Sequence, residues 1–211
     1  MIKKSTYNDS EIRIQKVEIG EQGLIGAIGL LGLKGYNEYN GYNGYTGSYP
    51  VHYIGESYGG GKVFYVYDDG QHGLIAATTD QYAGVGIQWY NGTYRYTGTT
   101  SDGVHAGTMD TAIIIATQMA DTTGGNFAAK VCADYSVTVG GITYGDWYLP
   151  SRYELNLLYE QKDVVGDFAN YYYWSSSEAS KLEAWHQFFA NGAQEADPKN
   201  YEFQVRAVRA F

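Results

Sequence analysis

The segment GDWYLPSRYELNLLY, residues 145–159, carries the clearest local signal in the chain. Ser151 is followed three residues later by Glu154, which is the spacing of a capping box, in which each side chain accepts a hydrogen bond from the other residue's backbone N–H at the start of a helix. Leu155, Leu158 and Tyr159 then recur at the spacing of one helical face. The segment therefore predicts a helix that begins just after Ser151 and packs one side against a core.

A second helix is expected within residues 107–127. Thr108 or Asp110 can serve as its N-cap, and Gly124 with Gly125 would end it. Apolar and small side chains populate mostly one side of this segment, namely Ile113, Ile114, Thr117 and Met119.

Several segments predict antiparallel strands. Strands at 62–67 and 73–79 are separated by a turn rich in aspartate and glycine. A further hairpin is expected around Gly140-Gly141, and Asn191-Gly192, between two short runs, is the strongest short-range hairpin signal. Together with the two helices, these strands predict an α+β fold.

Upstream of this region, glycine recurs at every third position with one interruption at Glu38. The glycines of the repeat are Gly20, Gly23, Gly26, Gly29, Gly32, Gly35, Gly41, Gly44 and Gly47. Three residues per turn is the period of a polyproline II helix, and only glycine fits at the crowded axis where such helices associate. An α-helix would spread these glycines around its surface, and each would cost about 1 kcal/mol relative to alanine.

The repeat therefore predicts a collagen-like or polyglycine II-like stalk that self-associates, with a homotrimer as the expected assembly. An irregular glycine-rich linker is the alternative, because no proline lies between Gly20 and Gly47 to pre-set the backbone. The expected organisation is a strand-like assembly segment at 1–19, the stalk at 20–50 and a head domain at 51–211.

Four motifs in the head carry a resemblance to a known family. They are DGQHGLIAATTDQ (69–81), GDWYLPSRYELNLLY (145–159), YYYWSSSE (171–178) and VRAVRAF (205–211). In this order they closely resemble the C-terminal domain family of the Legionella collagen-like adhesin, which is a C-type-lectin-like domain, over roughly residues 55–211. The resemblance implies a head with two helices flanking antiparallel strands and a role in adhesion. Similar heads occur on phage tail fibres.

Composition and charge exclude several classes of function. The net charge of −9 disfavours nucleic acid and anionic membranes as partners, and no apolar run is long enough for a membrane span. The four histidines are scattered singly, without the spacing of a zinc site, and no cofactor is expected. No dense loop of Asp, Asn and Glu favours calcium, so no metal ligand is assigned and calcium binding stays open. Cys132 is the only cysteine, which excludes an intrachain disulfide and the paired-cysteine oxidase chemistry known on the same broad fold, and it is expected to be buried.

An enzyme is not expected. Carboxylate pairs such as Asp163 with Asp167 are read as solvated turn residues, and Ser175, Ser176 and Ser177 lack the flanking glycines of a nucleophile elbow. The three serines are interpreted as a hydrogen-bonded turn. Glu154 is expected to form an ion pair with Arg206 or Arg209.

The candidate ligand-binding residues surround the Asn191-Gly192 hairpin. Alternation along the preceding strand assigns Trp185, Gln187 and Phe189 to the core and turns His186 and Phe188 outward. The candidate contacts are Lys181, Glu183, His186, Phe188, Glu195, Lys199 and Tyr201. The competing interpretation is that Phe188 covers the core beneath the loop at 194–201.

Two functions remain open on sequence alone. The first is a trimeric adhesin or receptor-binding fibre protein that attaches to a cell-surface glycan or protein receptor. The second is a structural subunit of an extracellular filament or matrix, in which the triplet stalk and tyrosine-rich surfaces form subunit contacts. In both cases the expected location is extracellular, on a virion or on a cell-surface filament. The N-terminal lysines are not followed by the apolar run of a secretory signal, which favours a virion.

The stalk yields the first testable prediction. Replacing both Gly29 and Gly32 by alanine places methyl groups at the crowded axis and should dissociate the assembly while the head stays folded. Mass measurement in solution would show a shift from trimer to monomer. A double variant that remains trimeric would contradict assembly through these glycines.

Overall fold

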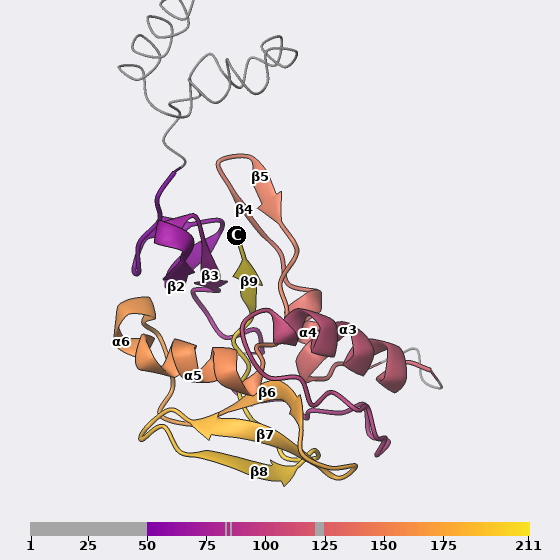
Figure 1. Cartoon of the computed structure of the whole chain (residues 1–211). Helices are drawn as coiled ribbons and strands as arrows, with labels where there is room; N and C mark the ends of the chain where they lie inside the picture. Colours follow the sequence, from indigo (N-terminus) through magenta and orange to yellow (C-terminus); the bar gives the residue numbers. More distant parts are fainter. Residues whose placement is uncertain (1–49, 83, 85, 121–124) are drawn as a thin grey trace, which may run out of the picture. The chain divides into compact units, whose positions relative to one another are not determined.

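The computed structural model describes residues 50–211, apart from residues 83, 85 and 121–124 (Figure 1). The chain divides into two units, Met1–Tyr49 and Pro50–Phe211. The predicted assembly segment at 1–19 and all the glycines of the triplet repeat lie outside the described residues. Within Pro50–Phe211 the fold is α+β, with antiparallel sheets and several helices.

The first sheet joins the beginning of this unit to its end. It contains four antiparallel strands in the order β1-β2-β3-β9. Their bounds are β1 Ser57–Tyr58, β2 Gly61–Tyr67, β3 His72–Ala76 and β9 Val208–Ala210. The predicted pairing of the first two long strands is confirmed, and a short 3-10 turn, η3 Asp68–Gly70, connects them. Figure 1 shows β9 beside β3, close to the C-terminus.

The second sheet is a three-stranded antiparallel meander. Its strands are β6 Tyr172–Glu178, β7 Glu183–Phe188 and β8 Gln194–Pro198. The hairpin predicted at Asn191-Gly192 is confirmed, since β7 and β8 pair across it. The interpretation of Ser175, Ser176 and Ser177 as a turn is wrong, because all three lie within β6.

A small separate hairpin pairs β4 Val137–Val139 with β5 Ile142–Tyr144. It confirms the turn predicted at Gly140-Gly141, where both glycines have positive φ angles that other residues rarely adopt. Thr138 and Thr143 face each other across this pair, with their hydroxyl oxygens 2.8 Å apart.

Four α-helices lie among the described residues, where two were expected. They are α3 Ala106–Gln118, α4 Ala128–Ala133, α5 Arg152–Glu160 and α6 Lys162–Val165. The prediction of α5 is confirmed, and both hydrogen bonds of the capping box at Ser151 and Glu154 are present. Neither α4 nor α6 was predicted, because helices of six and four residues are too short to show a hydrophobic period.

Helix α3 forms where expected but begins differently. Its N-cap is His105, which has a left-handed backbone and makes no capping side-chain hydrogen bond, so Thr108 and Asp110 do not cap it. Asp110 instead lies within α3, several residues after its start, and is buried. The helix ends at Gln118, before the glycines predicted to stop it, and the Asn91 amide donates a hydrogen bond to the Gln118 carbonyl.

The buried carboxylate of Glu154 binds both helix starts. Oε1 accepts hydrogen bonds from His105 N at 2.7 Å and from the Tyr148 hydroxyl at 2.9 Å. Oε2 accepts from Ser151 N at 2.8 Å and Gly107 N at 3.2 Å. A Cβ atom on Gly107 would lie 2.6 Å from Oε2, so glycine permits this close approach. The start of α3 and the start of α5 therefore share one acceptor.

The predicted ion pair between Glu154 and a C-terminal arginine is wrong. Arg206 Nε donates to Asp80 Oδ1 at 2.7 Å, and Arg209 Nε donates to Asp146 Oδ1 at 2.7 Å. The guanidinium of Arg206 is fully buried and also donates to backbone carbonyls. The arginines still anchor the C-terminal segment, but through partners that lie far from them in sequence.

Two clusters of buried side chains form the core. Trp89 and Trp174 are fully buried in the first, and their indole N–H groups donate to the carbonyls of Ser175 at 2.8 Å and Ile87 at 2.9 Å. Cys132 belongs to the same cluster, which confirms that it is buried. No helix between residues 50 and 211, where described, is both long and apolar enough to cross a bilayer.

Truncating Glu154 tests the shared acceptor. Glu154→Ala leaves three backbone N–H groups and one hydroxyl buried without their partner, which should cost at least about 3 kcal/mol. Tyr148→Phe removes only one of these hydrogen bonds and should cost about 1 kcal/mol. For a domain of this size, calorimetry should show melting temperatures lower by about 6 °C or more and by about 2–4 °C, respectively. Equal losses in the two variants would show that the carboxylate does not join the two helices.

Candidate functional site

The β6-β7-β8 sheet presents two different faces. Tyr173 pairs with Gln187 on the face that α5 covers, where the Gln187 amide donates to Asn156 Oδ1 at 2.9 Å. Figure 1 shows α5 running along this sheet. The opposite face carries Tyr172, Trp174, His186 and Phe188, and we call it the aromatic face.

His186 was predicted to point outward, and this prediction is wrong. Its side chain is only 1% exposed, and the ring of Phe203 packs 4.8 Å from the imidazole between ring centroids. Phe203 reaches this position because the chain returns along β6, where Gln204 N donates to Tyr172 O at 2.9 Å. Alternation along β7 places His186 on the correct face but does not reveal the later segment that covers that face.

Burial sets the protonation of His186. Desolvation lowers the pKa of the imidazole, and the nearby carboxylates of Asp197 and Glu195 oppose this shift. The neutral ring therefore donates its Nε2–H to Asp197 Oδ2 at 2.8 Å. Nδ1 has no hydrogen-bond partner among the described residues.

Lys199 is a second candidate contact that lies inside the protein. Its side chain is fully buried, and the ammonium forms an ion pair with the equally buried Glu178. It also donates to the carbonyls of Arg95 at 3.0 Å and Lys181 at 3.1 Å, and it lies over the ring of Trp89. Lys199 is therefore an internal cation and offers no group to an external ligand.

The remaining candidates do not converge on one surface site. Lys181, Glu183, Glu195 and Tyr201 are exposed. Phe188 is half-buried and stacks on Tyr172 with ring centroids 4.6 Å apart. A pocket does lie on the aromatic face, but Tyr201 is the only one of the seven predicted residues that lines it.

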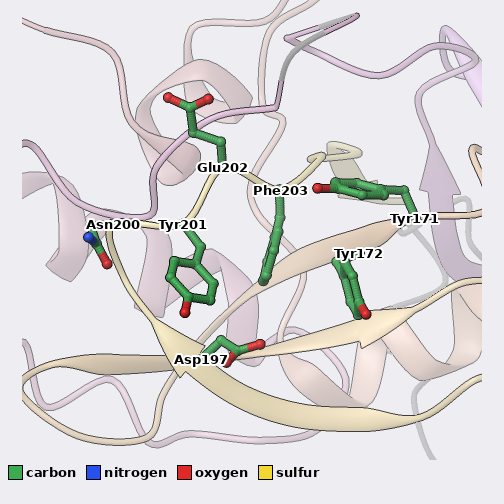
Figure 2. A pocket seen from close by; sticks show the side chains of 7 residues that line it. All are labelled: Tyr171, Tyr172, Asp197, Asn200, Tyr201, Glu202 and Phe203. Atoms are coloured by element: carbon green, nitrogen blue, oxygen red, sulfur yellow. The ribbon is translucent and has the colours of Figure 1, made fainter.

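This open pocket has a volume of about 570 Å³. It lies where the chain leaves β8 and enters residues 199–207, which we call the returning segment. Its lining residues are Tyr171, Tyr172, Asp197, Asn200, Tyr201, Glu202 and Phe203. Figure 2 shows the rings of Tyr201, Phe203 and Tyr172 side by side near the Asp197 carboxylate, whereas Glu202 points away from it. This grouping was not predicted, although the run of tyrosines at 171–173 is a signal in the sequence.

Exposed aromatic rings and a carboxylate fixed by a hydrogen bond give the pocket its chemistry. Tyr171 is 43% exposed and Tyr201 is 47% exposed, whereas Phe203 is 5% exposed and forms the base. In the described part of the chain, His186 is the only hydrogen-bond donor to Asp197, and it occupies Oδ2. Oδ1 is therefore available to a ligand, with aromatic surface beside it for stacking.

The described residues contain no group of three or more histidine, cysteine, aspartate or glutamate side chains placed to hold a metal ion. No protein-family model matches the sequence, and no curated protein matches it either. The described residues form an α+β domain with an aromatic and acidic surface pocket.

Lys199 lies in a buried ion pair and Lys181 is exposed, so replacing these two predicted contact residues should change the free energy of unfolding by different amounts. Lys199→Met leaves the Glu178 carboxylate buried without its cation and should cost about 3–5 kcal/mol. Adding Glu178→Gln removes the uncompensated charge and should recover much of this loss. Lys181→Ala, at an exposed position, should stay within about 0.5 kcal/mol of the wild type. Urea unfolding of the full chain measures all three, and a Lys199→Met variant as stable as Lys181→Ala would contradict the buried pair.

Proposed function

We propose that residues 51–211 form the head of an adhesin or receptor-binding fibre protein, which attaches to a cell-surface glycan or protein receptor. The observation that carries the proposal is the pocket on the aromatic face. There, exposed tyrosine rings stand beside a carboxylate oxygen that no described residue occupies. Stacking surface with a fixed polar group suits weak recognition of a small chemical group on a larger surface.

The proposal includes a C-type-lectin-like head. Its support is the resemblance of the four sequence motifs and, in outline, the expected combination of helices with antiparallel strands. Helices α3 and α5 and the two larger sheets supply that combination. The motif segments also meet in the fold. Tyr148 pairs with Val208, Ala77 N donates to Ala207 O at 2.9 Å, and Ser176 N donates to Pro150 O at 2.8 Å.

The proposal also includes a homotrimeric stalk and an extracellular location on a virion or a cell-surface filament. Its support is the glycine repeat, because three chains joined along their glycines would present three heads together. A single weak contact gains strength when linked contacts engage the same surface. A shallow pocket on each head is therefore sufficient for attachment.

A structural subunit of a filament is the second candidate. The observation in its favour is that large apolar side chains are also exposed away from the pocket. Val139 and Ile142 on the β4-β5 hairpin are 54% and 58% exposed, and Met109 on α3 is 63% exposed. Such side chains would serve as contacts between packed subunits.

Removing the two exposed rings tests attachment. The double variant Tyr171→Ala/Tyr201→Ala should weaken attachment of the full chain by at least about tenfold, because the stacking surface is lost. Labelled protein would be measured on a printed glycan panel and on live cells. The melting temperature should change by only a few degrees because both rings are exposed.

Tyr153→Ala is the matched control. Tyr153 is 44% exposed but lies on α5, which covers the opposite face of the sheet, so this variant should attach like the wild type. A folded double variant that attaches normally would place the contact elsewhere. A wild-type chain that binds no surface but forms filaments would favour the structural subunit.

A further inference from the structure

The pocket on the aromatic face is acidic. Asp197 contributes a carboxyl group, whereas the carboxyl group of the lining residue Glu202 points away from the rings (Figure 2). None of the described residues that line the pocket is basic. Glu195, opposite His186 in the sheet, adds a further exposed carboxyl group on β8. Anionic ligands such as sulfated sugars would be repelled from this surface, and the net charge of −9 adds to the effect.

Two basic side chains near these strands, those of Lys199 and His186, do not compensate this charge. Lys199 turns into the protein and pairs with Glu178. His186 holds Asp197 by a hydrogen bond, but its burial favours the neutral imidazole. Asp197 is thus fixed in place by a neutral donor, and its second oxygen receives no hydrogen bond from any described residue.

The aromatic rings that line the pocket add attraction for a cation. Tyr171 lies against Tyr172 and Phe203, with ring centroids 5.3 Å and 6.2 Å away, and Tyr201 lies 5.9 Å from Phe203 on the other side. The faces of aromatic rings carry partial negative charge and attract cations within about 6 Å. An ammonium group with alkyl substituents benefits from both the rings and the carboxylate, whereas a neutral sugar benefits mainly from stacking.

We propose that the pocket binds an organic cation, namely an ammonium group bearing methyl or alkyl substituents. This inference rests on the proposed function, since the cation would be the group recognised on the attached surface. The same chemistry is found in a choline-type headgroup and in a lysine side chain. Rings supply cation–π attraction, and Asp197 supplies the opposite charge.

A comparison of choline with its neutral carbon isostere, 3,3-dimethyl-1-butanol, separates the contribution of charge to binding from that of shape. Each is titrated into the full chain while the tyrosine resonances are followed by NMR. Choline should bind with a Kd on the order of millimolar, at least about fivefold tighter than the isostere. Nα-acetyl-lysine methylamide, titrated in parallel, distinguishes a lysine side chain from a quaternary headgroup as the preferred source.

Asp197→Asn tests the carboxylate without removing the acceptor for His186. This variant should weaken choline binding by at least about fivefold and leave binding of the isostere unchanged. Glu183→Gln is the matched control, because this exposed carboxylate does not line the pocket. It should bind choline like the wild type.

The outcomes separate this inference from the proposed function. Equal binding of choline and the isostere, or binding of methyl β-galactoside without choline, overturns the cation site. If surface attachment still depends on Tyr171 and Tyr201 in that case, the adhesive function stands. If choline binding is lost in the tyrosine double variant but attachment persists, the cation site stands and the adhesive role of the pocket is wrong.

Discussion

One buried carboxylate fixes the relative position of two helices. Glu154 accepts hydrogen bonds from the first turns of both α3 and α5, so a single negative charge satisfies N–H groups that each helix start would otherwise leave without a partner. Gly107 makes this possible because any side chain there would collide with the carboxylate. A second negative charge beside Glu154 is unfavourable. Burial, together with the charge of Glu154, raises the pKa of nearby Asp110 to about 7.

The position of α5 then decides which face of the β6-β7-β8 sheet is left open. Arg152 lies over Trp185, and its carbonyl accepts a hydrogen bond from Gln194, so the start of α5 contacts both β7 and β8. With that face covered, the returning segment occupies the other face. Arg206, held by Asp80, fixes the end of this segment, and Phe203 within it forms the base of the pocket.

Burial separates polar residues that stabilise the head from those that can meet a ligand. Lys199 and His186 look like ordinary surface residues in the sequence, yet both are buried and engaged with acidic partners. Glu178, the partner of Lys199, also accepts hydrogen bonds from the backbone of Thr97 and Gly98, so this pair attaches a loop to the sheet. What remains exposed on the aromatic face is largely tyrosine and carboxylate.

Elements whose causes lie within a few residues could be predicted from the sequence alone. The capping box at Ser151 and Glu154, the Asn191-Gly192 hairpin and the Gly140-Gly141 hairpin all form as predicted, because local hydrogen bonds and backbone freedom specify them. Tertiary contacts, in contrast, set the start of α3, the partners of Arg206 and Arg209, and the burial of His186 and Lys199. Each of these depends on a segment far away in sequence: Asp80 for Arg206, Trp89 for Lys199 and a carboxylate on α5 for the start of α3. Strand alternation assigns a side chain to a face, but burial depends on which distant segment covers that face.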